Sequence, residues 1–408
     1  MDINKIRKDF PMLNNNKTMQ GHPFSYFDNA ATTLKPKCVI DKICEYYEFY
    51  SVNSHRGDYD LAQRVDDEIL KARDNVCKLI NADEKEVIFT SGATMGLNQI
   101  AQGLKRFLSK DDEILITDAE HASNVLPWFR IASEIGCKVN YIPLENGRIT
   151  IRNIKKVISS KTKIVSIAHV TNVLGYVNDI KEIAKFVHGY NAYFVCDGAQ
   201  SVPHFKVDVK DLDVDFLVFS GHKMCGPTGI GVMYGKYELL KEIDSLLLGG
   251  GMNTEFDLCG NFGYLKTPFK FEAGTQNIAG IIGLGKAIEY LNEIGMDNIE
   301  KYERELKEYA VTKLLNEVPE VIIYNKDSEA GIIDFNYEGV HAQDMGTLLG
   351  SYGICVRTGE HCAKLLHNEI GTNSTVRASL YFYNTKEEID RFVEACKKGR
   401  DFLDVFFA

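Results

Sequence analysis

Short β-rich runs alternate with helical stretches in this chain from about residue 86 to about residue 285. Because a strand, a helix and a further strand in this order form a crossover unit, the alternation predicts an α/β fold with a mostly parallel central sheet sandwiched by helices. Continuous apolar runs such as residues 193–196 fit strands buried on both faces. The predicted helices span residues 93–107, 124–135, 180–188 and 236–242, and the predicted strands span residues 86–90, 113–117, 138–142, 163–168, 192–197, 215–219 and 230–234.

The pattern changes after about residue 285, where the helices become longer and the strands fewer. This second part predicts a smaller α+β domain. We expect a large domain at residues 24–287 and a small domain made of residues 1–23 and 288–408. In the second part, helical patterns span residues 281–315, 342–352 and 386–406, and strand patterns span residues 321–324 and 331–336.

Charge and cysteine usage exclude several classes of protein. The chain holds 47 Lys and Arg against 57 Asp and Glu, and this net charge of −10 argues against nucleic acid as the main partner. The ten cysteines show neither a CxxC pair nor zinc-ligand spacing, so we predict no metal site and no disulfide framework. The amino terminus lacks the apolar core of a signal peptide, and no stretch reaches the roughly 18 apolar residues of a membrane helix. We therefore expect a cytoplasmic protein without membrane contact.

One lysine follows a predicted strand in a context that favours chemistry. Lys223 lies in the small, glycine-flanked turn Ser220–Pro227, directly after strand 215–219. A lysine amine at the mouth of a sheet can form a Schiff base when burial or nearby charge lowers its pKa. A lone lysine on a loop is more often simply solvated. Asp197 ends the preceding strand 26 residues earlier, so we expect both side chains at the sheet edge where open α/β folds bind ligands.

The side chains expected at this edge suit a pyridine-type cofactor. A buried carboxylate at Asp197 can keep a pyridinium nitrogen protonated, so that the ring withdraws electrons from a substrate carbanion. The imidazole of His121 can stack on such a ring, and Gln200 or Asn172 can reach its phenolic oxygen. Taken alone, an aspartate after a strand more often caps a turn or a helix.

A phosphate cradle is predicted at the start of the helix 93–107. The turn Thr90–Gly96 joins a strand to this helix, so its backbone N–H groups, including that of Ala93, and the Thr94 hydroxyl can meet an anion. Ser220 and His222, beside Lys223, would add contacts. Such a turn is by itself often only a helix cap.

These segments resemble the class V, fold-type I pyridoxal-phosphate enzymes along nearly the whole chain, and among them the SUF-type (group II) cysteine desulfurases. The resemblance implies a fold-type I PLP-dependent transferase in which Lys223 holds pyridoxal 5′-phosphate. The segments that carry it are Tyr26–Thr33, Asn53–Gly57, Glu120–Asn124, Asp197–Gln200, Ser220–Lys223, Phe271–Thr275 and Arg377–Leu380.

The segment Arg357–Ala363 narrows the reaction, because it resembles the short catalytic-cysteine loop of those desulfurases. The resemblance implies that Cys362 takes sulfur from L-cysteine, becomes a persulfide and leaves L-alanine. Arg377 would bind the substrate carboxylate with its planar fork, assisted by Arg357 and Asn172. Lys223 would carry the proton of the substrate Cα, and His121 would serve the substrate thiol as acid and base.

The resemblance also implies partners. Thr275 resembles the residue that reaches the cofactor phosphate from a neighbouring subunit, which implies a homodimer with a shared site. The persulfide sulfur would pass to a sulfur-acceptor protein of the SUF system for iron–sulfur cluster assembly.

The cysteine loop departs from the family pattern at Glu360, Lys364 and Leu365. A carboxylate at Glu360 tends to raise the pKa of a neighbouring thiol, and Lys364 can offset it. The effect on activation of Cys362 stays open at this point.

Three other functions remain open from the sequence. A selenocysteine or cystine lyase of the same family would share the chemistry and differ in substrate preference. A transaminase or epimerase of the same fold would not need Cys362. A degenerate binding partner in a sulfur-transfer complex would fit the altered loop, but the intact set of Lys223, Asp197 and His121 speaks against it.

Overall fold

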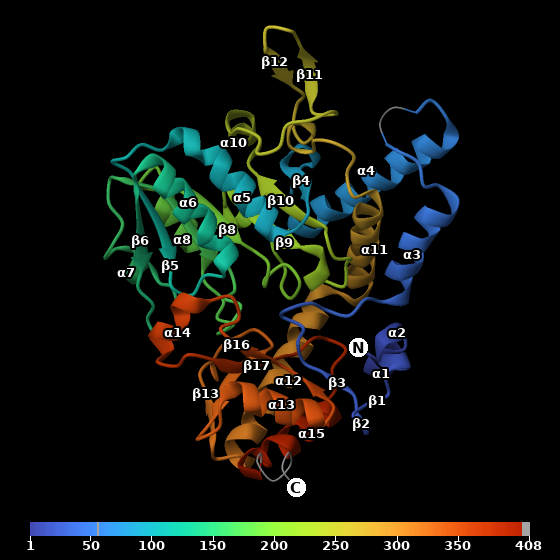
Figure 1. Cartoon of the computed structure of the whole chain (residues 1–408), viewed down its shortest axis with the longest axis vertical. Coiled ribbons are helices and arrows are strands. Elements are labelled where there is room, and N and C mark those ends of the chain that lie inside the picture. The colour runs from blue at the N-terminus through green and yellow to red at the C-terminus, as the bar shows by residue number, and fades with distance from the viewer. Residues whose placement is uncertain (55–56, 402–408) are drawn as a thin grey trace.

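The computed structural model describes residues 1–54 and 57–401 (Figure 1). Its central sheet has seven strands in the order β4-β10-β9-β8-β7-β5-β6. The five strands from β9 to β6 run parallel, which confirms the predicted α/β fold with a mostly parallel sheet. The strands are β4 (Val87–Thr90), β5 (Glu113–Thr117), β6 (Lys138–Ile142), β7 (Thr162–Ala168), β8 (Tyr193–Asp197), β9 (Phe216–Ser220) and β10 (Gly231–Gly235).

Strand β10 runs antiparallel to both of its neighbours, β9 and β4. Only residues 221–230 connect β9 to β10, and no α-helix lies between them. A parallel return needs a crossover of about a dozen residues or more, so this short connection turns the chain back on itself.

Different helices bury the two faces of the central sheet. One core takes side chains from α4 (Asp60–Ile80), α8 (Ile180–His188) and α11 (Ile278–Ile294). The other takes them from α5 (Ala93–Leu104), α6 (Leu126–Ile135) and α10 (Tyr237–Glu242). The sheet is therefore sandwiched, as the apolar strand runs predict. Helix α3 (Lys37–Phe49) packs against α11, and the short helices α7 (Ile151–Ile154) and α9 (Val209–Leu212) lie in connections.

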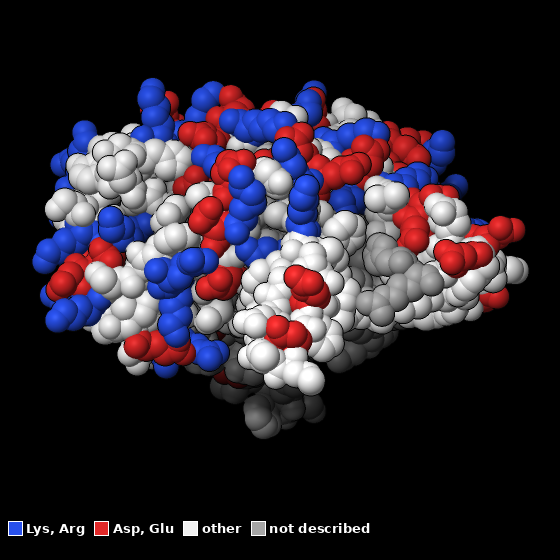
Figure 2. All heavy atoms as spheres, turned by 90° about the horizontal axis from the view of Figure 1, so that it is seen from above, with Lys and Arg blue, Asp and Glu red and all other residues white. Residues whose placement is uncertain are grey.

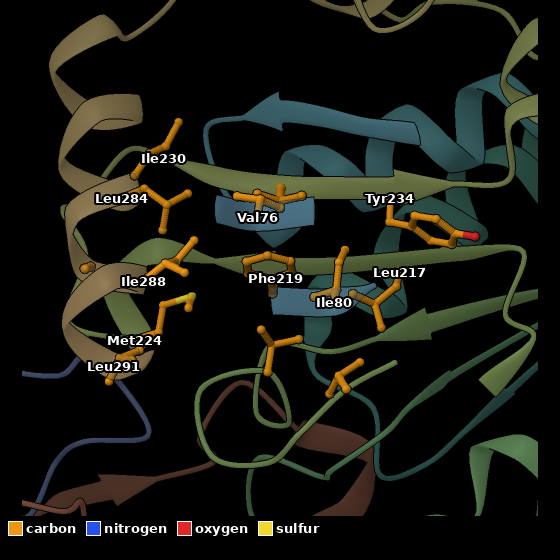
Figure 3. Packing of buried hydrophobic residues seen from close by; sticks show 14 of the residues in the cluster. Val76, Ile80, Leu217, Phe219, Met224, Ile230, Tyr234, Leu284, Ile288 and Leu291 are labelled. Atoms are coloured by element: carbon orange, nitrogen blue, oxygen red, sulfur yellow. The ribbon is translucent and has the colours of Figure 1, made fainter. Parts of the chain in front are cut away.

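Successive side chains along β9 point to opposite faces of the sheet, so the strand contributes to both cores. Leu217 and Phe219 belong to the core of α4 and α11, and Phe216 and Val218 belong to the core on the opposite face. Figure 3 shows Phe219 close to Val76 of α4, with Leu284 and Ile288 of α11 to its left. Because all four side chains are fully buried, β9 holds Lys223 at its carboxyl end on a rigid support.

A second sheet of four strands, in the order β13-β14-β17-β16, lies in the part of the chain predicted to form the small domain. All of its pairings are antiparallel. The single predicted helix 281–315 is in fact two helices, because Gly295 has φ +89° and ends α11. The elements are β13 (Val321–Ile323), β14 (Ile332–Tyr337), β16 (Arg357–Gly359), β17 (Thr375–Ser379), α12 (Met296–Glu317), α13 (Ala342–Ser351), α14 (Lys364–Ile370) and α15 (Lys386–Cys396).

The amino-terminal residues link the two sheets. Strand β3 (Ser25–Tyr26) pairs in parallel with β15 (Ile354–Cys355) of the small domain. Phe10 is fully buried in the core of the large sheet and lies 4.6 Å from the ring of Tyr383. The remaining amino-terminal elements are α1 (Ile3–Arg7), α2 (Pro11–Asn15), β1 (Thr18–Met19) and β2 (His22–Pro23).

Some expectations are not settled by this fold. The division into residues 24–287 and the rest stays a prediction, and its second boundary falls inside α11. His55 and Arg56, within one segment of the family resemblance, and residues 402–406 of the predicted last helix lie outside the described residues. Among residues 1–54 and 57–401, no helix is long and apolar enough to cross a membrane.

A two-stranded hairpin projects from the large domain (Figure 1). It is made of β11 (Asn253–Phe256) and β12 (Phe262–Tyr264). Phe256 and Leu258 on it are 78% and 107% exposed. Figure 2, which looks down on this end of the molecule, shows a mainly uncharged region near the centre, with charged side chains crowded along the upper edge. Such exposed apolar side chains are typical of an interaction surface.

Candidate active site

A cavity of about 250 Å³ brings the predicted site residues together. The carboxyl ends of β7, β8 and β9 line one side of it, and β16, β17 and the turn after β16 line another. Every predicted site residue except Thr275 contributes to its wall, namely Ala93, Thr94, His121, Asn172, Asp197, Gln200, Ser220, His222, Lys223, Arg357, Cys362 and Arg377.

Lys223 ends a short 3-10 turn (Gly221–Lys223) that directly follows β9. Burial lowers the pKa of Lys223 to about 8, against the attraction of Asp197, which favours the charged form. With such a pKa, about a tenth of the amine is neutral at pH 7. A neutral amine is the form that attacks an aldehyde, so this lysine is suited to hold a carbonyl cofactor.

Asp197 ends β8, the parallel neighbour of β9. The side chain is almost fully buried, and its Oδ1 accepts a hydrogen bond of 2.9 Å from the backbone N–H of Ala199. Burial raises the pKa of Asp197, while the positive charge of Lys223 lowers it. The turn-capping role is therefore present, and Asp197 also lines the cavity.

His121 precedes a 3-10 turn (Ala122–Asn124) after β5. Its Nδ1 accepts a hydrogen bond of 3.1 Å from the backbone N–H of Ser123. Burial, together with the nearby positive charges of Lys223, Arg377 and Arg357, lowers the pKa of His121 to about 4. The imidazole is therefore neutral at pH 7, with its proton on Nε2.

The turn before α5 brings together the groups that the sequence analysis expects to form an anion cradle. The Oγ of Ser220 accepts a hydrogen bond of 2.9 Å from the N–H of Ala93, and the hydroxyls of Thr94 and Ser123 lie 2.7 Å apart. The backbone packs too tightly here for side chains, since a Cβ on Gly231 would lie 2.6 Å from Cα of Gly92. Hydroxyls and a helix start at one place suit a phosphate group.

Two amides at the cavity keep an oxygen free. Nε2 of Gln200 donates to the carbonyl of Ala30, and Nδ2 of Asn172 donates to the carbonyl of His361, both at 2.8 Å. Oε1 of Gln200 and Oδ1 of Asn172 are buried and have no partner among the described residues. Buried polar atoms without a partner indicate a ligand or water. Together with the lysine, the aspartate and the cradle, they fit pyridoxal phosphate.

Two arginines stand opposite each other in the small sheet. Arg357 of β16 and Arg377 of β17 are register partners, a placement that destabilises a sheet by charge repulsion. The carboxylate of Asp28 offsets this repulsion, because its oxygens lie 3.7 Å from Nη1 of Arg357 and 3.6 Å from Nη2 of Arg377. One carboxylate against two guanidiniums leaves a net positive charge at the cavity, which suits an anionic substrate group.

Cys362 lies in a strained turn beside these groups. Both His361 and Cys362 have left-handed backbone, with φ of +51° and +58°, and Cys362 is exposed. This conformation costs roughly 1–2 kcal/mol per residue, so other contacts must hold it. The N–H of Ala122 donates to the carbonyl of Cys362 at 2.7 Å, which joins the cysteine turn to the His121 turn.

Lys364 does not pair with Glu360, since neither side chain forms an ion pair with any described residue. Among the cavity residues that the sequence analysis did not name as site residues, two have polar side chains, Ser123 and His361. His361 could have been found from its position beside Cys362. Ser123 could not, because its approach to Thr94 depends on the packing of α5 against the loop after β5.

Thr275 lies away from this cavity. It is exposed, in the turn before α11. The turn is anchored by Glu272, whose carboxylate receives two hydrogen bonds from Nη2 of the buried Arg73, at 3.0 and 2.8 Å. Within one copy of the chain, Thr275 therefore reaches no part of the cradle wall.

Known proteins are similar to this chain in sequence and in fold over nearly its full length. The family model for aminotransferase class-V matches residues 25–392. A protein of Halalkalibacterium halodurans named "Probable cysteine desulfurase" is 43% identical over 412 residues, which cover 100% of both chains.

Solved structures of cysteine desulfurases are also similar to this chain. The S-sulfonic acid form of the cysteine desulfurase CsdA from Escherichia coli is 36% identical, with a TM-score of 0.91 over 98% of this chain and 99% of that chain. The apo structure of a cysteine desulfurase from Thermococcus onnurineus NA1 is 37% identical, with a TM-score of 0.91 over 97% of both chains. The predicted fold-type I architecture is confirmed. Because the family model and these relatives span the chain almost from end to end, the chain belongs to the class-V aminotransferase family, among the members named cysteine desulfurases.

Proposed function

We propose that the chain is a pyridoxal-phosphate-dependent cysteine desulfurase, which converts L-cysteine to L-alanine and keeps the sulfur as a persulfide on Cys362. The observation that carries this proposal is the meeting, at one cavity, of a lysine of lowered pKa, a buried aspartate and an exposed cysteine. The first two suit a pyridine aldehyde, and the third distinguishes sulfur transfer from transamination.

The cofactor would be held by residues that meet at the sheet edge. Lys223 would bind its aldehyde, Asp197 would pair with its ring nitrogen, and the cradle of Ala93, Thr94 and Ser220 with His222 would take its phosphate. His121 would stack on the ring, and the unpaired oxygens of Gln200 and Asn172 would serve its polar substituents. When bound, pyridoxal phosphate withdraws electrons from the substrate Cα.

The substrate carboxylate would bind to the arginine pair. Arg377 is almost fully buried and already has Nη1 committed to the carbonyl of Asn172, at 2.8 Å. Its Nη2 and Arg357 share Asp28, and the incoming carboxylate neutralises the remaining positive charge. This contact fixes the amino acid relative to β17, the strand that carries Arg377.

The protein groups then move a proton and a sulfur atom. The amine of Lys223, released when the substrate amine takes its place, takes the proton from the substrate Cα and later returns it, and neutral His121 exchanges a proton with the substrate thiol through Nε2. The Cys362 thiolate attacks the substrate sulfur, so the bond between sulfur and Cβ breaks and a sulfur–sulfur bond forms. The electron pair left on the carbon fragment is protonated to give L-alanine, and atoms and charges balance.

We further propose that the enzyme is a cytoplasmic homodimer of the SUF system. Thr275 reaches no phosphate site within its own copy, and the exposed hairpin with Phe256 and Leu258 supports contact with a second copy. The persulfide would pass to a sulfur-acceptor protein for iron–sulfur cluster assembly. The exposure of Cys362 supports this handover.

The test is the release of alanine and sulfide from L-cysteine by the cofactor-loaded enzyme with a thiol reductant. We expect the two products in equal amounts and the loss of both in Cys362→Ser. Cys44→Ala, which removes another exposed thiol, is the matched control and should keep full activity. Retained turnover in Cys362→Ser would contradict the proposal and favour an aminotransferase or epimerase. The same assay with selenocysteine and cystine separates the desulfurase from a lyase of those substrates.

A further inference from the structure

A hydrogen-bonded chain of buried side chains leads from the small sheet to the cysteine turn. Asp334 of β14, Thr375 of β17 and His361 are all at most 5% exposed. The hydroxyl of Thr375 donates to Oδ1 of Asp334 at 2.6 Å. Nε2 of His361 lies 3.0 Å from the same hydroxyl and 3.2 Å from the carbonyl of Thr375.

The directions of these bonds follow from the chemistry of the groups. A carbonyl oxygen can only accept, so Nε2 of His361 carries a proton and donates to Thr375. The Thr375 hydroxyl gives its one proton to Asp334 and therefore presents a lone pair to His361. Asp334 thus fixes the orientation of a hydroxyl that in turn fixes the imidazole.

This chain ends at the strained part of the molecule. His361 and Cys362 both have left-handed backbone, and the turn is held from the opposite side by Asn172 and Ala122. Those two contacts grip backbone carbonyls alone. The imidazole of His361 is the side chain through which the turn is tied to the small sheet at Thr375.

Strand β17 supports the substrate contact as well. Thr375 and Arg377 are two residues apart, so their side chains lie on the same face of the strand about 7 Å apart along it. Asp334 is the register partner of Arg377 on β14. One rigid, fully buried strand therefore carries both the carboxylate-binding arginine and the anchor of the cysteine turn.

We propose that Thr375 and Asp334 are positioning residues, which act through His361 to hold the Cys362 thiol at a fixed separation from Arg377. This inference rests on the proposed desulfurase function. In that reaction the substrate is fixed by Arg377, and its sulfur must meet a thiol on another segment, so the spacing set by β17 determines the attack distance.

The experiment compares Thr375→Val, which keeps the shape and removes the hydroxyl, with Thr375→Ser, which keeps the hydroxyl. In the holoenzyme, we expect Thr375→Val to lower kcat about tenfold or more while KM for L-cysteine stays within about twofold. The absorption spectrum of the bound cofactor should not change. Iodoacetamide should alkylate Cys362 faster than in the wild type, as followed by mass spectrometry of its peptide, because the turn is released. Thr375→Ser should restore the wild-type values.

Two outcomes would overturn the proposal. One is a wild-type kcat and alkylation rate in Thr375→Val, and the other is equal loss in the Val and Ser variants, which would indicate a packing role only. If Thr375→Val does not fold, His361→Gln against His361→Ala gives the same comparison, since the glutamine keeps an Nε2 donor. Alkylation requires no turnover, so it tests the positioning even if the wild-type enzyme releases no alanine and the proposed function fails.

Discussion

At the scale of single residues, the amine of Lys223 is the group whose charge state most directly controls the site. Because its pKa is lowered to about 8, we expect the rate of pyridoxal phosphate uptake by the apo-protein to rise with pH and to level off above about 8. Uptake is measured by cofactor absorbance and by borohydride trapping. Asp197→Asn removes the attraction that favours the ammonium, so its midpoint should move to lower pH. A wild-type midpoint near that of an ordinary lysine would contradict this prediction.

Asp334 gives a prediction for stability. Burial raises its pKa from 3.8 to about 8, so between these values the folded protein keeps a proton that the unfolded chain has released. This contribution to the free energy of unfolding is fully present below pH 4 and is lost as the pH rises towards 8, by at most about 1.4 kcal/mol per pH unit. Urea unfolding at pH 5.5 and 8 should therefore show a smaller loss of stability in Asp334→Asn than in the wild type. Asp111→Asn, at an exposed position, is the control and should behave like the wild type.

At the scale of elements, the sequence was sufficient to place most of the site. Lys223 and Asp197 follow apolar runs whose period and length identify strands, so their common edge could be predicted without coordinates. The facing of Arg357 and Arg377 could not, because it depends on the register between β16 and β17. The same holds for Thr375 and His361. These contacts come from pairing between distant segments, which local patterns do not encode, and they include like charges that local rules disfavour.

The link between α4 and the turn before α11 is an element-scale prediction. Arg73 and Glu272 form a buried ion pair, with side chains 5% and 4% exposed. Arg73→Met leaves the Glu272 carboxylate buried without its partner, so we expect a loss of about 3–5 kcal/mol in the free energy of urea unfolding. The double variant with Glu272→Gln removes the uncompensated charge and should recover part of the loss. A single variant as stable as the wild type would show that the pair does not anchor the turn.

At the scale of the whole molecule, the proposed dimer predicts a link between assembly and cofactor binding. Phe256→Asp with Leu258→Asp places charges on the exposed hairpin and should shift the enzyme towards the monomer in sedimentation velocity. Because Thr275 would then be missing from the neighbouring cradle, pyridoxal phosphate should dissociate faster. Ile322→Asp, at a 49% exposed position on the small sheet, is the control and should remain dimeric. A monomeric wild type would contradict the shared site.

The hydrogen bond from the N–H of Ala122 to the carbonyl of Cys362 joins two segments that lie far apart in the sequence. Mutations can change one of these segments without changing the other. Within one copy of the chain, the groups proposed to hold the cofactor lie between Ala93 and Lys223, and the proposed nucleophile, Cys362, sits in a short turn after β16. An ancestral enzyme that already activated amino acids could therefore acquire or lose sulfur transfer through a few codons in that turn. A new reaction can therefore arise in this fold while the residues proposed to bind the cofactor stay the same.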